Sequence, residues 1–508
     1  MVAKTLGGLE EVLAEELRGI GAENVEPGRR SVSFEGDLEI MYRANLQCRT
    51  ALRILKPIFT FKASDPDELY ERVKEYDWST LMDENSTFAI DSTVYSETFR
   101  NSRFVTYRVK DAIADQFVDR LGEGKRPGVR LTDADVLINV HIAENRVTVS
   151  LDSSGESLHK RGYRVASTEA PINEVLAAGI ILKSGWRGDC PFVDLMCGSG
   201  TFLIEAAMIA ANIMPGIYRQ SFAFERWADF DQELFDSIYN DDSDERTPAH
   251  GIFGADISPK AIAIATKNIK AAGLSKYITL EEKALSKWEE APEEGIPGVL
   301  VTNPPYGERI SADDMTGLYS MIGTKLKHVF KGYHAWIIGY KEEYFHEIGL
   351  SPSQKEPVDN GGLECELREY VIFDGDMKSF KREGGKLKKE KREQKPERSG
   401  FRKGDRKDGP RKFRDRDDDR REHKDRKDYH KDRREHGERK ERRDYGERKF
   451  ERRQDRDFRS ERSDEPESEN PLAKRRNPKL LSTIGKNKPQ LAAKPNMISR
   501  KGWRKKED

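Results

Sequence analysis

The stretch FVDLMCGSGTFLIEAAMIA, residues 192–210, constrains the fold more than any other part of the sequence. An apolar run ends at Asp194, a Gly-Ser-Gly turn follows, and a long apolar helix begins at Thr201. Gly198 and Gly200 let the backbone turn sharply and approach a ligand with no side chain between. A strand, a glycine turn and a helix in this order are typical of a doubly wound α/β sheet.

Strands and helices keep alternating through residues 190–374, so we expect a Rossmann-like α/β domain here. The expected strands are 192–197, 252–257, 278–281, 299–302 and 335–340, with a closing pair around 364–373. The clearest helices are expected at 202–212 and 259–272.

The glycine turn also narrows the class of ligand. Its spacing is D-x-x-x-G-x-G, which has no third glycine at the dinucleotide position and is not a phosphate loop. The Asp194 carboxylate at the strand tip would repel a pyrophosphate, but it suits the cationic amino-acid and sulfonium parts of S-adenosylmethionine. Asp256 ends the next strand and can accept both ribose hydroxyls there. The alternative role for Asp256 is a simple helix cap before Pro259.

A second corner, TNPPYGERI at 302–310, ends the apolar strand 299–302. On its own a Pro-Pro pair is a strand-terminating turn. At the carboxyl edge of a parallel sheet, the Asn303 side-chain oxygen and the Pro304 carbonyl can accept hydrogen bonds from a planar exocyclic amine. Pro305 fixes the turn without competing as a donor, and Tyr306 offers a ring for a base to stack on. These four residues are the expected catalytic set, acting by positioning and without a metal.

Residues 1–155 read as an α+β module. A helix is expected to close on Gly21, strands are expected in RSVSFEG and TFAIDSTVYS, and a hairpin is expected around 144–145. The stretch RFVTYRVKDAIADQFVDRLG is expected to pass from a strand into an amphipathic helix. A basic and aromatic patch then precedes another helix and is interpreted as RNA contact, with a solvated connector as the alternative. It comprises His159, Lys160, Arg161, Tyr163 and Arg164.

Charge is sorted along the chain. Residues 378–508 hold 49 of the 90 Lys and Arg and 29 of the 91 Asp and Glu, which leaves 41 basic and 62 acidic residues in 1–377. An acidic body with a net basic, periodicity-free tail predicts disorder in 377–508 and a polyanionic partner for the tail. Four cysteines without a CxxC pair, glutamates near the N-terminus and no long apolar run predict a cytoplasmic protein without zinc or a membrane span.

The motifs DLMCGSGT, GADIS, NPPYGERI and LHKRGYR together resemble the THUMP-domain class I RNA methyltransferases, and among them the bacterial 23S rRNA guanine-N2 enzymes. The resemblance implies a ferredoxin-like part at 1–45, a THUMP RNA-binding domain at 46–155, a linker and leading helix at 156–189, and a class I methyltransferase domain at 190–376. It implies S-adenosylmethionine as cofactor and 23S rRNA as partner. The implied cofactor-binding residues are Asp194, Cys197, Gly198, Gly200, Thr201, Asp256, Ile257 and Asn303.

The sequence departs from the family pattern at two places, and two alternative functions stay open. An inserted segment, about 214–249, separates Asp194 from Asp256 and is interpreted as a family feature over the cofactor or substrate. Lys283 and Ala284 stand where the family commonly has an acidic residue near the adenine, so a side-chain contact to the adenine is not expected here, and a backbone N–H could serve instead. The alternatives are an adenine-N6 or protein glutamine methyltransferase, and a non-catalytic RNA-binding ribosome-assembly protein.

Overall fold

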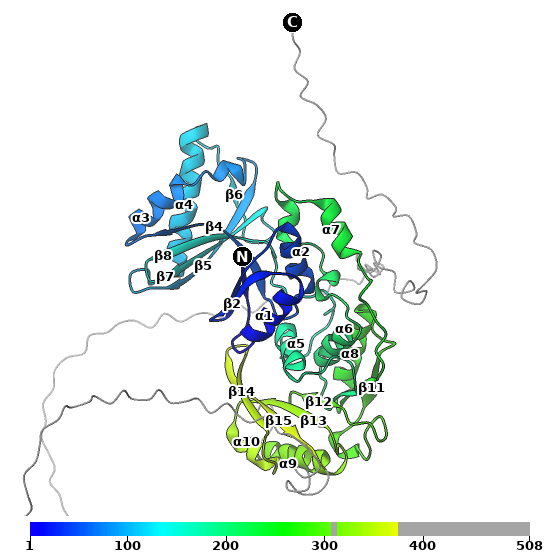
Figure 1. The fold of residues 1–508 in the computed structure, drawn as a ribbon. Coiled ribbons are helices and arrows are strands. Elements are labelled where there is room, and N and C mark those ends of the chain that lie inside the picture. The colour runs from blue at the N-terminus through cyan, green and yellow to red at the C-terminus, as the bar shows by residue number, and fades with distance from the viewer. Residues whose placement is uncertain (306–311, 374–508) are drawn as a thin grey trace, which may run out of the picture. The chain divides into compact units, whose positions relative to one another are not determined.

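The computed structural model describes residues 1–305 and 312–373. Tyr306 of the expected catalytic set and the expected tail at 377–508 therefore lie outside the described residues. The expected α/β class, with an α+β region before a Rossmann-like sheet, is confirmed (Figure 1).

The first sheet has eight strands in the order β2-β3-β1-β4-β8-β7-β5-β6. Its strands are β1 (Val2–Lys4), β2 (Glu23–Gly28), β3 (Ser31–Glu35), β4 (Arg53–Lys62), β5 (Thr87–Tyr95), β6 (Gly128–Val129), β7 (Val136–Ala143) and β8 (Arg146–Asp152). Its helices are α1 (Glu10–Gly19), α2 (Leu38–Gln47), α3 (Pro66–Glu75) and α4 (Ser102–Leu121), with a 3-10 turn η1 (Trp78–Thr80). Strand β4 pairs with β1 on one side and β8 on the other, so the two N-terminal parts share one continuous sheet.

Helix α4 corrects one expectation. The stretch that was expected to begin as a strand is helical from Ser102 onward. Asn101 caps the helix, because its side chain accepts a hydrogen bond of 3.3 Å from the Phe104 N–H. Val105 and Val109 lie four residues apart and are both fully buried. The β-branched and aromatic residues here follow helical spacing toward the core, and this tertiary packing outweighs their strand propensity.

The second sheet has seven strands in the order β11-β10-β9-β12-β13-β15-β14. Its strands are β9 (Phe192–Asp194), β10 (Ile252–Asp256), β11 (Ile278–Glu282), β12 (Val299–Thr302), β13 (His334–Gly339), β14 (Gln354–Asn360) and β15 (Leu363–Val371). The other elements are α5 (Glu174–Lys183), α6 (Thr201–Ala210), η2 (Pro215–Tyr218), η3 (Ala223–Arg226), α7 (Gln232–Tyr239), α8 (Pro259–Ala271), η4 (Leu285–Lys287), α9 (Ala312–His328) and α10 (Glu342–Glu347).

Both faces of this sheet are buried, because successive side chains of its strands enter two different cores. In β12, Val299 and Val301 join the core that contains α5, α6 and α8, whereas Leu300 joins the core of α9 and α10. Strand β13 divides its residues in the same way. The strand that ends at Asn303 is therefore packed on both faces, and this packing fixes the position of the Asn303 corner.

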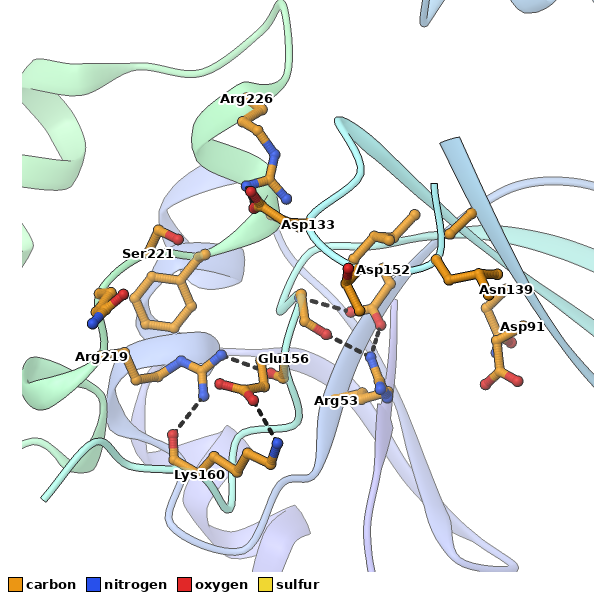
Figure 2. A pocket seen from close by; sticks show the side chains of 18 of the residues that line it. Arg53, Asp91, Asp133, Asn139, Asp152, Glu156, Lys160, Arg219, Ser221 and Arg226 are labelled. Atoms are coloured by element: carbon orange, nitrogen blue, oxygen red, sulfur yellow. Dashed lines mark hydrogen bonds and ion pairs between the residues drawn. The ribbon is translucent and has the colours of Figure 1, made fainter. Parts of the chain in front are cut away.

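The inserted segment at 214–249 packs against the N-terminal sheet. The Arg226 guanidinium donates to the Ala134 carbonyl at 2.8 Å, and the Phe224 N–H donates to the Ser153 carbonyl at 3.1 Å. Between this segment and strands β5 and β7 lies a cavity of about 680 Å³ (Figure 2).

Three global features bear on the sequence expectations. No helix among the described residues is long and apolar enough to cross a membrane. Within 1–305 and 312–373, no cluster of His, Cys, Asp and Glu is suited to hold a metal ion. The four cysteines are free thiols, and three of them are buried.

Candidate active site

The candidate site lies where the strand order of the second sheet reverses. From β9 the chain runs outward through β10 and β11, and it then returns to place β12 on the other side of β9. Such a switch point leaves a crevice at the carboxyl ends of the strands, where ligands bind in open α/β sheets. Asp194 ends β9, and Asn303 directly follows β12. The topology therefore brings the glycine turn and the NPP corner to neighbouring positions.

A buried hydrogen bond joins these two corners. The Thr302 hydroxyl donates to Asp194 Oδ1 at 2.9 Å, and both residues are almost fully buried. The Met196 N–H donates to the same carboxylate oxygen at 3.2 Å. Because Thr302 immediately precedes Asn303, the position of the expected catalytic corner is coupled to the strand tip that begins the cofactor turn.

The glycine turn has the backbone that its sequence requires. Gly198 and Gly200 have φ angles of +52° and +82°, in the left-handed region that favours glycine. A Cβ at Gly198 would meet no atom within 4 Å and so would point into open space, whereas a Cβ at Gly200 would lie 3.2 Å from Cβ of Ala265 in α8. Gly198 thus leaves room on the open side of the turn, and Gly200 allows close helix packing.

Asp256 is fixed at the tip of β10 by two backbone donors. The Gly198 N–H donates to its Oδ2 at 3.0 Å, and the Ser258 N–H donates to its Oδ1 at 2.9 Å. The helix-cap function belongs to Ser258, whose hydroxyl accepts from the Ala261 N–H. Asp256 is therefore not the cap of α8, and its partly exposed carboxylate lies against the glycine turn.

The residues of this edge fit S-adenosylmethionine. Asp256 offers a partly exposed carboxylate, Gly198 leaves open space, and Ile257 exposes 73% of its surface as an apolar contact for an adenine. Asp194 is 1% exposed and binds the Met196 N–H and the Thr302 hydroxyl, so in this structure it orders the turn from below. Cys197 and Thr201 flank the turn and are buried. The N–H of Lys283 donates to the Asp256 carbonyl at 3.0 Å, so it is not available to an adenine, and the backbone contact expected for 283–284 does not come from Lys283.

Burial raises the pKa of Asp194 to about 7, against the opposing effect of hydrogen bonds from the Met196 N–H and the Thr302 hydroxyl. The folded chain therefore retains this proton to about pH 7, whereas an unfolded aspartate loses it near its ordinary pKa of 3.8. Protonation of Asp194 favours the folded state at low pH, and this contribution is lost as the pH rises through about 7.

We expect the Asp194→Asn variant to show a weaker fall in thermal unfolding temperature between pH 5 and pH 8 than the parent chain. The neutral amide cannot ionise, so it removes a pH-dependent cost of about 2 kcal/mol over this range. Calorimetric unfolding of both chains at several pH values measures the difference. Parallel curves for the two proteins would show that Asp194 is already ionised at pH 5.

The basic and aromatic patch lies mostly inside the protein, which corrects the expected RNA contact. Arg161 and Tyr163 are 2% and 1% exposed, and both contact Glu205 of α6, at 3.4 Å and 3.0 Å. Interior side chains of this kind present no surface to RNA. His159 is half-buried and binds the Ser157 hydroxyl, and Lys160 is exposed. Only these two stay candidates for RNA contact.

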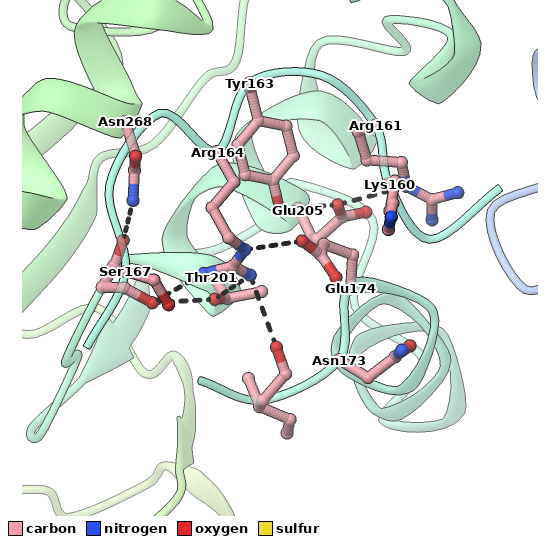
Figure 3. Close-up of polar contacts among 12 residues, drawn as sticks. Lys160, Arg161, Tyr163, Arg164, Ser167, Asn173, Glu174, Thr201, Glu205 and Asn268 are labelled. Atoms are coloured by element: carbon pink, nitrogen blue, oxygen red, sulfur yellow. Dashed lines mark hydrogen bonds and ion pairs between the residues drawn. The ribbon is translucent and has the colours of Figure 1, made fainter. Parts of the chain in front are cut away.

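Arg164, the last member of the patch, braces the glycine turn (Figure 3). Its guanidinium donates to Glu174 Oε1 at 2.7 Å and to the hydroxyls of Ser199 and Thr201, each at 2.9 Å. Asn268 of α8 binds the same region: its side chain accepts from two N–H groups of 165–166 and donates to the Ser199 carbonyl at 3.0 Å. The segment after the patch therefore positions the cofactor turn.

We expect Arg164→Ala to weaken binding of S-adenosylhomocysteine about tenfold, because the turn loses two charge-assisted hydrogen bonds and Glu174 loses its partner. Arg164→Lys retains the charge but only part of the donor fork, so it should recover part of the affinity. Titration calorimetry measures both, and Arg103→Ala on the exposed start of α4 is the matched control. Equal affinities for all four chains would refute the bracing role.

Comparison with known families agrees with this geometry. The family described as "RMKL-like, methyltransferase domain" matches residues 161–369, the THUMP domain matches 63–152, and the RlmL ferredoxin-like domain matches 1–55. A candidate RNA methyltransferase of Synechocystis sp. is 38% identical over 72% of this chain and 95% of its own length. The chain belongs to the THUMP-domain class I RNA methyltransferases. The resemblance drawn from the motifs is confirmed, and the cofactor of this methyltransferase family is S-adenosylmethionine.

Other relatives of this THUMP-domain methyltransferase extend the comparison. The ribosomal RNA large subunit methyltransferase K/L of Marinomonas sp. is 40% identical over 73% of this chain and 52% of its own length, so the chain spans about half of that relative. The crystal structure of SMU.472, a candidate methyltransferase complexed with S-adenosylhomocysteine, has a TM-score of 0.66 and 31% identity. The match covers 74% of this chain and 98% of that one.

Proposed function

We propose that the chain transfers a methyl group from S-adenosylmethionine to the exocyclic N2 amine of a guanine in 23S ribosomal RNA. The observation that carries the proposal is the Thr302–Asp194 hydrogen bond, which couples the Asn303 corner to the cofactor turn. The similarity to the large-subunit K/L enzymes supports ribosomal RNA as the substrate, and the THUMP domain supports RNA recognition.

The chemistry assigned to this chain is mainly positioning. When bound, S-adenosylmethionine supplies the electrophilic methyl group. The Asn303 side-chain oxygen and the Pro304 carbonyl accept hydrogen bonds from the two amine N–H groups, which directs the nitrogen lone pair at the methyl carbon. Pro305 has no N–H to compete for these acceptors. The amine becomes more acidic as it is alkylated, so its proton can pass to water without a strong general base.

The test uses the purified chain, labelled S-adenosylmethionine, and ribosomal RNA from a strain that lacks the homologous enzyme. Digestion to nucleosides should place the label in N2-methylguanosine, and mapping should place it at one site of 23S RNA. Label in N6-methyladenosine, or in a protein glutamine, would overturn the assignment in favour of those activities. No transfer by the parent chain would favour the non-catalytic RNA-binding alternative.

A further inference from the structure

The cavity beside the N-terminal sheet has two walls of different origin. One wall is the open face of β5 and β7, and the other is formed by 218–226 of the inserted segment together with 155–162. Its volume of about 680 Å³ falls within the range of small-molecule and nucleotide sites. None of the described residues that line it belongs to the sheet edge of the active site.

Two polar side chains on the sheet wall lack partners. Asp91 of β5 and Asn139 of β7 are register partners on adjacent parallel strands, so their side chains emerge on the same face about 5 Å apart. Only 7% of the Asn139 surface is exposed, and its side-chain amide makes no hydrogen bond to another described residue. Asp91 is exposed and also lacks a partner in 1–305 and 312–373. The polar atoms of Asn139 are not among the fully buried ones that lack a partner in the described part of the chain, and the residue lines the cavity. Its amide therefore reaches the cavity together with the Asp91 carboxylate, where a ligand or solvent can bind both groups.

Three cations of the cavity are paired with carboxylates, whereas the Arg219 guanidinium donates to backbone carbonyls. Arg53 binds Asp152 on the sheet side, Lys160 binds Glu156, and Arg226 contacts Asp133 at 3.4 Å (Figure 2). Asp152 is almost fully buried, so its pair with Arg53 is part of the scaffold. Lys160 and Arg226 belong to more exposed ion pairs. Such pairs contribute little to stability in water, so a phosphate can replace the carboxylate partner at a small cost in free energy.

We propose that this cavity holds an unstacked nucleotide of single-stranded RNA. Asp91 accepts hydrogen bonds from the N–H donors of a base edge, Asn139 supplies an adjacent donor and acceptor, and Lys160 and Arg226 face the flanking phosphates. An amide beside a carboxylate is complementary to the donor and acceptor groups on the Watson–Crick edge of a splayed base. The proposal rests on the RNA substrate proposed above and assigns a second contact point, remote from the methylated base.

This assignment also gives the inserted segment a role. Interpreted from sequence as a cover for the cofactor or substrate, the segment builds the wall opposite Asp91 and Asn139. Ser221 on that wall is exposed, and the Arg219 guanidinium lies 5.1 Å from the Phe222 ring centroid, which holds the wall in place. The nucleotide would thus be held between the RNA-binding domain and the methyltransferase domain.

The test compares Asn139→Ala, Asp91→Asn and Ser221→Trp with the full-length parent chain. Short single-stranded RNA oligonucleotides serve as the binding probe, and fluorescence anisotropy measures the Kd. Each variant should bind RNA at least about tenfold more weakly, because it loses a base contact or fills the cavity. Affinity for S-adenosylhomocysteine should stay within twofold. Glu71→Gln, which removes an exposed carboxylate from α3, is the matched control and should bind RNA like the parent.

The outcomes separate this proposal from the proposed reaction. Folded variants that all bind the RNA with the parent's Kd would overturn it, whatever the methylation assay shows. Competition by free mononucleotides as strong as by the oligonucleotide would assign the cavity to a free nucleotide and also overturn it. If the parent transfers no methyl group to ribosomal RNA but the variants lose RNA affinity, the reaction fails and the cavity assignment stands. Asp91 and Ser221 are exposed, so their variants test the cavity even if Asn139→Ala unfolds.

Discussion

Asn303→Ala should lower the rate of methyl transfer to RNA at least about 100-fold, because the amine loses the side-chain acceptor that orients its lone pair. The loss should fall mainly on kcat, with the affinity for S-adenosylhomocysteine reduced only a few-fold, since Asp194, Asp256 and the glycine turn are unchanged. Single-turnover methylation and calorimetric titration measure the two effects separately.

Asn85→Ala, in an exposed loop of the N-terminal sheet, is the matched control and should retain the parent's rate. Asn303→Asp provides a second comparison, since it retains an oxygen acceptor while placing a negative charge next to the buried Asp194. A rate for Asn303→Ala within threefold of the parent would remove Asn303 from the catalytic set.

Glu205→Ala should destabilise the folded chain by about 3–5 kcal/mol, because it leaves the buried Arg161 guanidinium without its carboxylate and the Tyr163 hydroxyl without its acceptor. Glu205 is fully buried, and burial raises its pKa despite the neighbouring Arg161 charge. Arg49, 8% exposed, also lies near this carboxylate and has one nitrogen without a partner among the described residues. The thermal unfolding temperature should fall by about 5–10 °C.

The double variant Arg161→Met/Glu205→Leu is the informative control. It removes both charges and fills the space with apolar atoms, so it should recover more than half of the lost unfolding temperature. Lys160→Ala removes a neighbouring exposed cation and should leave that temperature unchanged. If Glu205→Ala unfolds at the parent's temperature, Arg161 is not held as a buried ion pair, and its expected contact with RNA would be open again.

The strands near the site could be predicted because their signals are local. The apolar run 299–302 is bounded by prolines and forms β12 over the same residues, and the hairpin around 144–145 forms with Glu144 in the left-handed region. Strand β13 differs from its expected bounds by one residue at each end. In each case residues within a few positions of one another fix the backbone, so a single sequence contains the information.

The interior position of the basic patch could not be predicted in this way. Arg161 pairs with Glu205, 44 positions later, and Asn268 is more than 100 positions from the two N–H groups of 165–166 that it binds. Nothing within the patch itself distinguishes an arginine that faces solvent from one that faces a carboxylate on a helix not yet formed. The pairing of Asp91 with Asn139 likewise depends on the register of two strands that are far apart in the sequence.

The continuous first sheet has a consequence for building chimaeras of this protein. Strand β4 is bonded to β1 through residues 53–55 and to β8 through 55–62, so one strand belongs to both N-terminal parts. If the RNA-binding module were exchanged at residue 45, β1 and β4 would come from different proteins, and their pairing could be lost. The strand edges left unpaired could then associate with other chains. The smallest segment that can be exchanged is therefore residues 1–155 as a whole. Any junction between the strands of this sheet would place two hydrogen-bonded neighbours in different proteins.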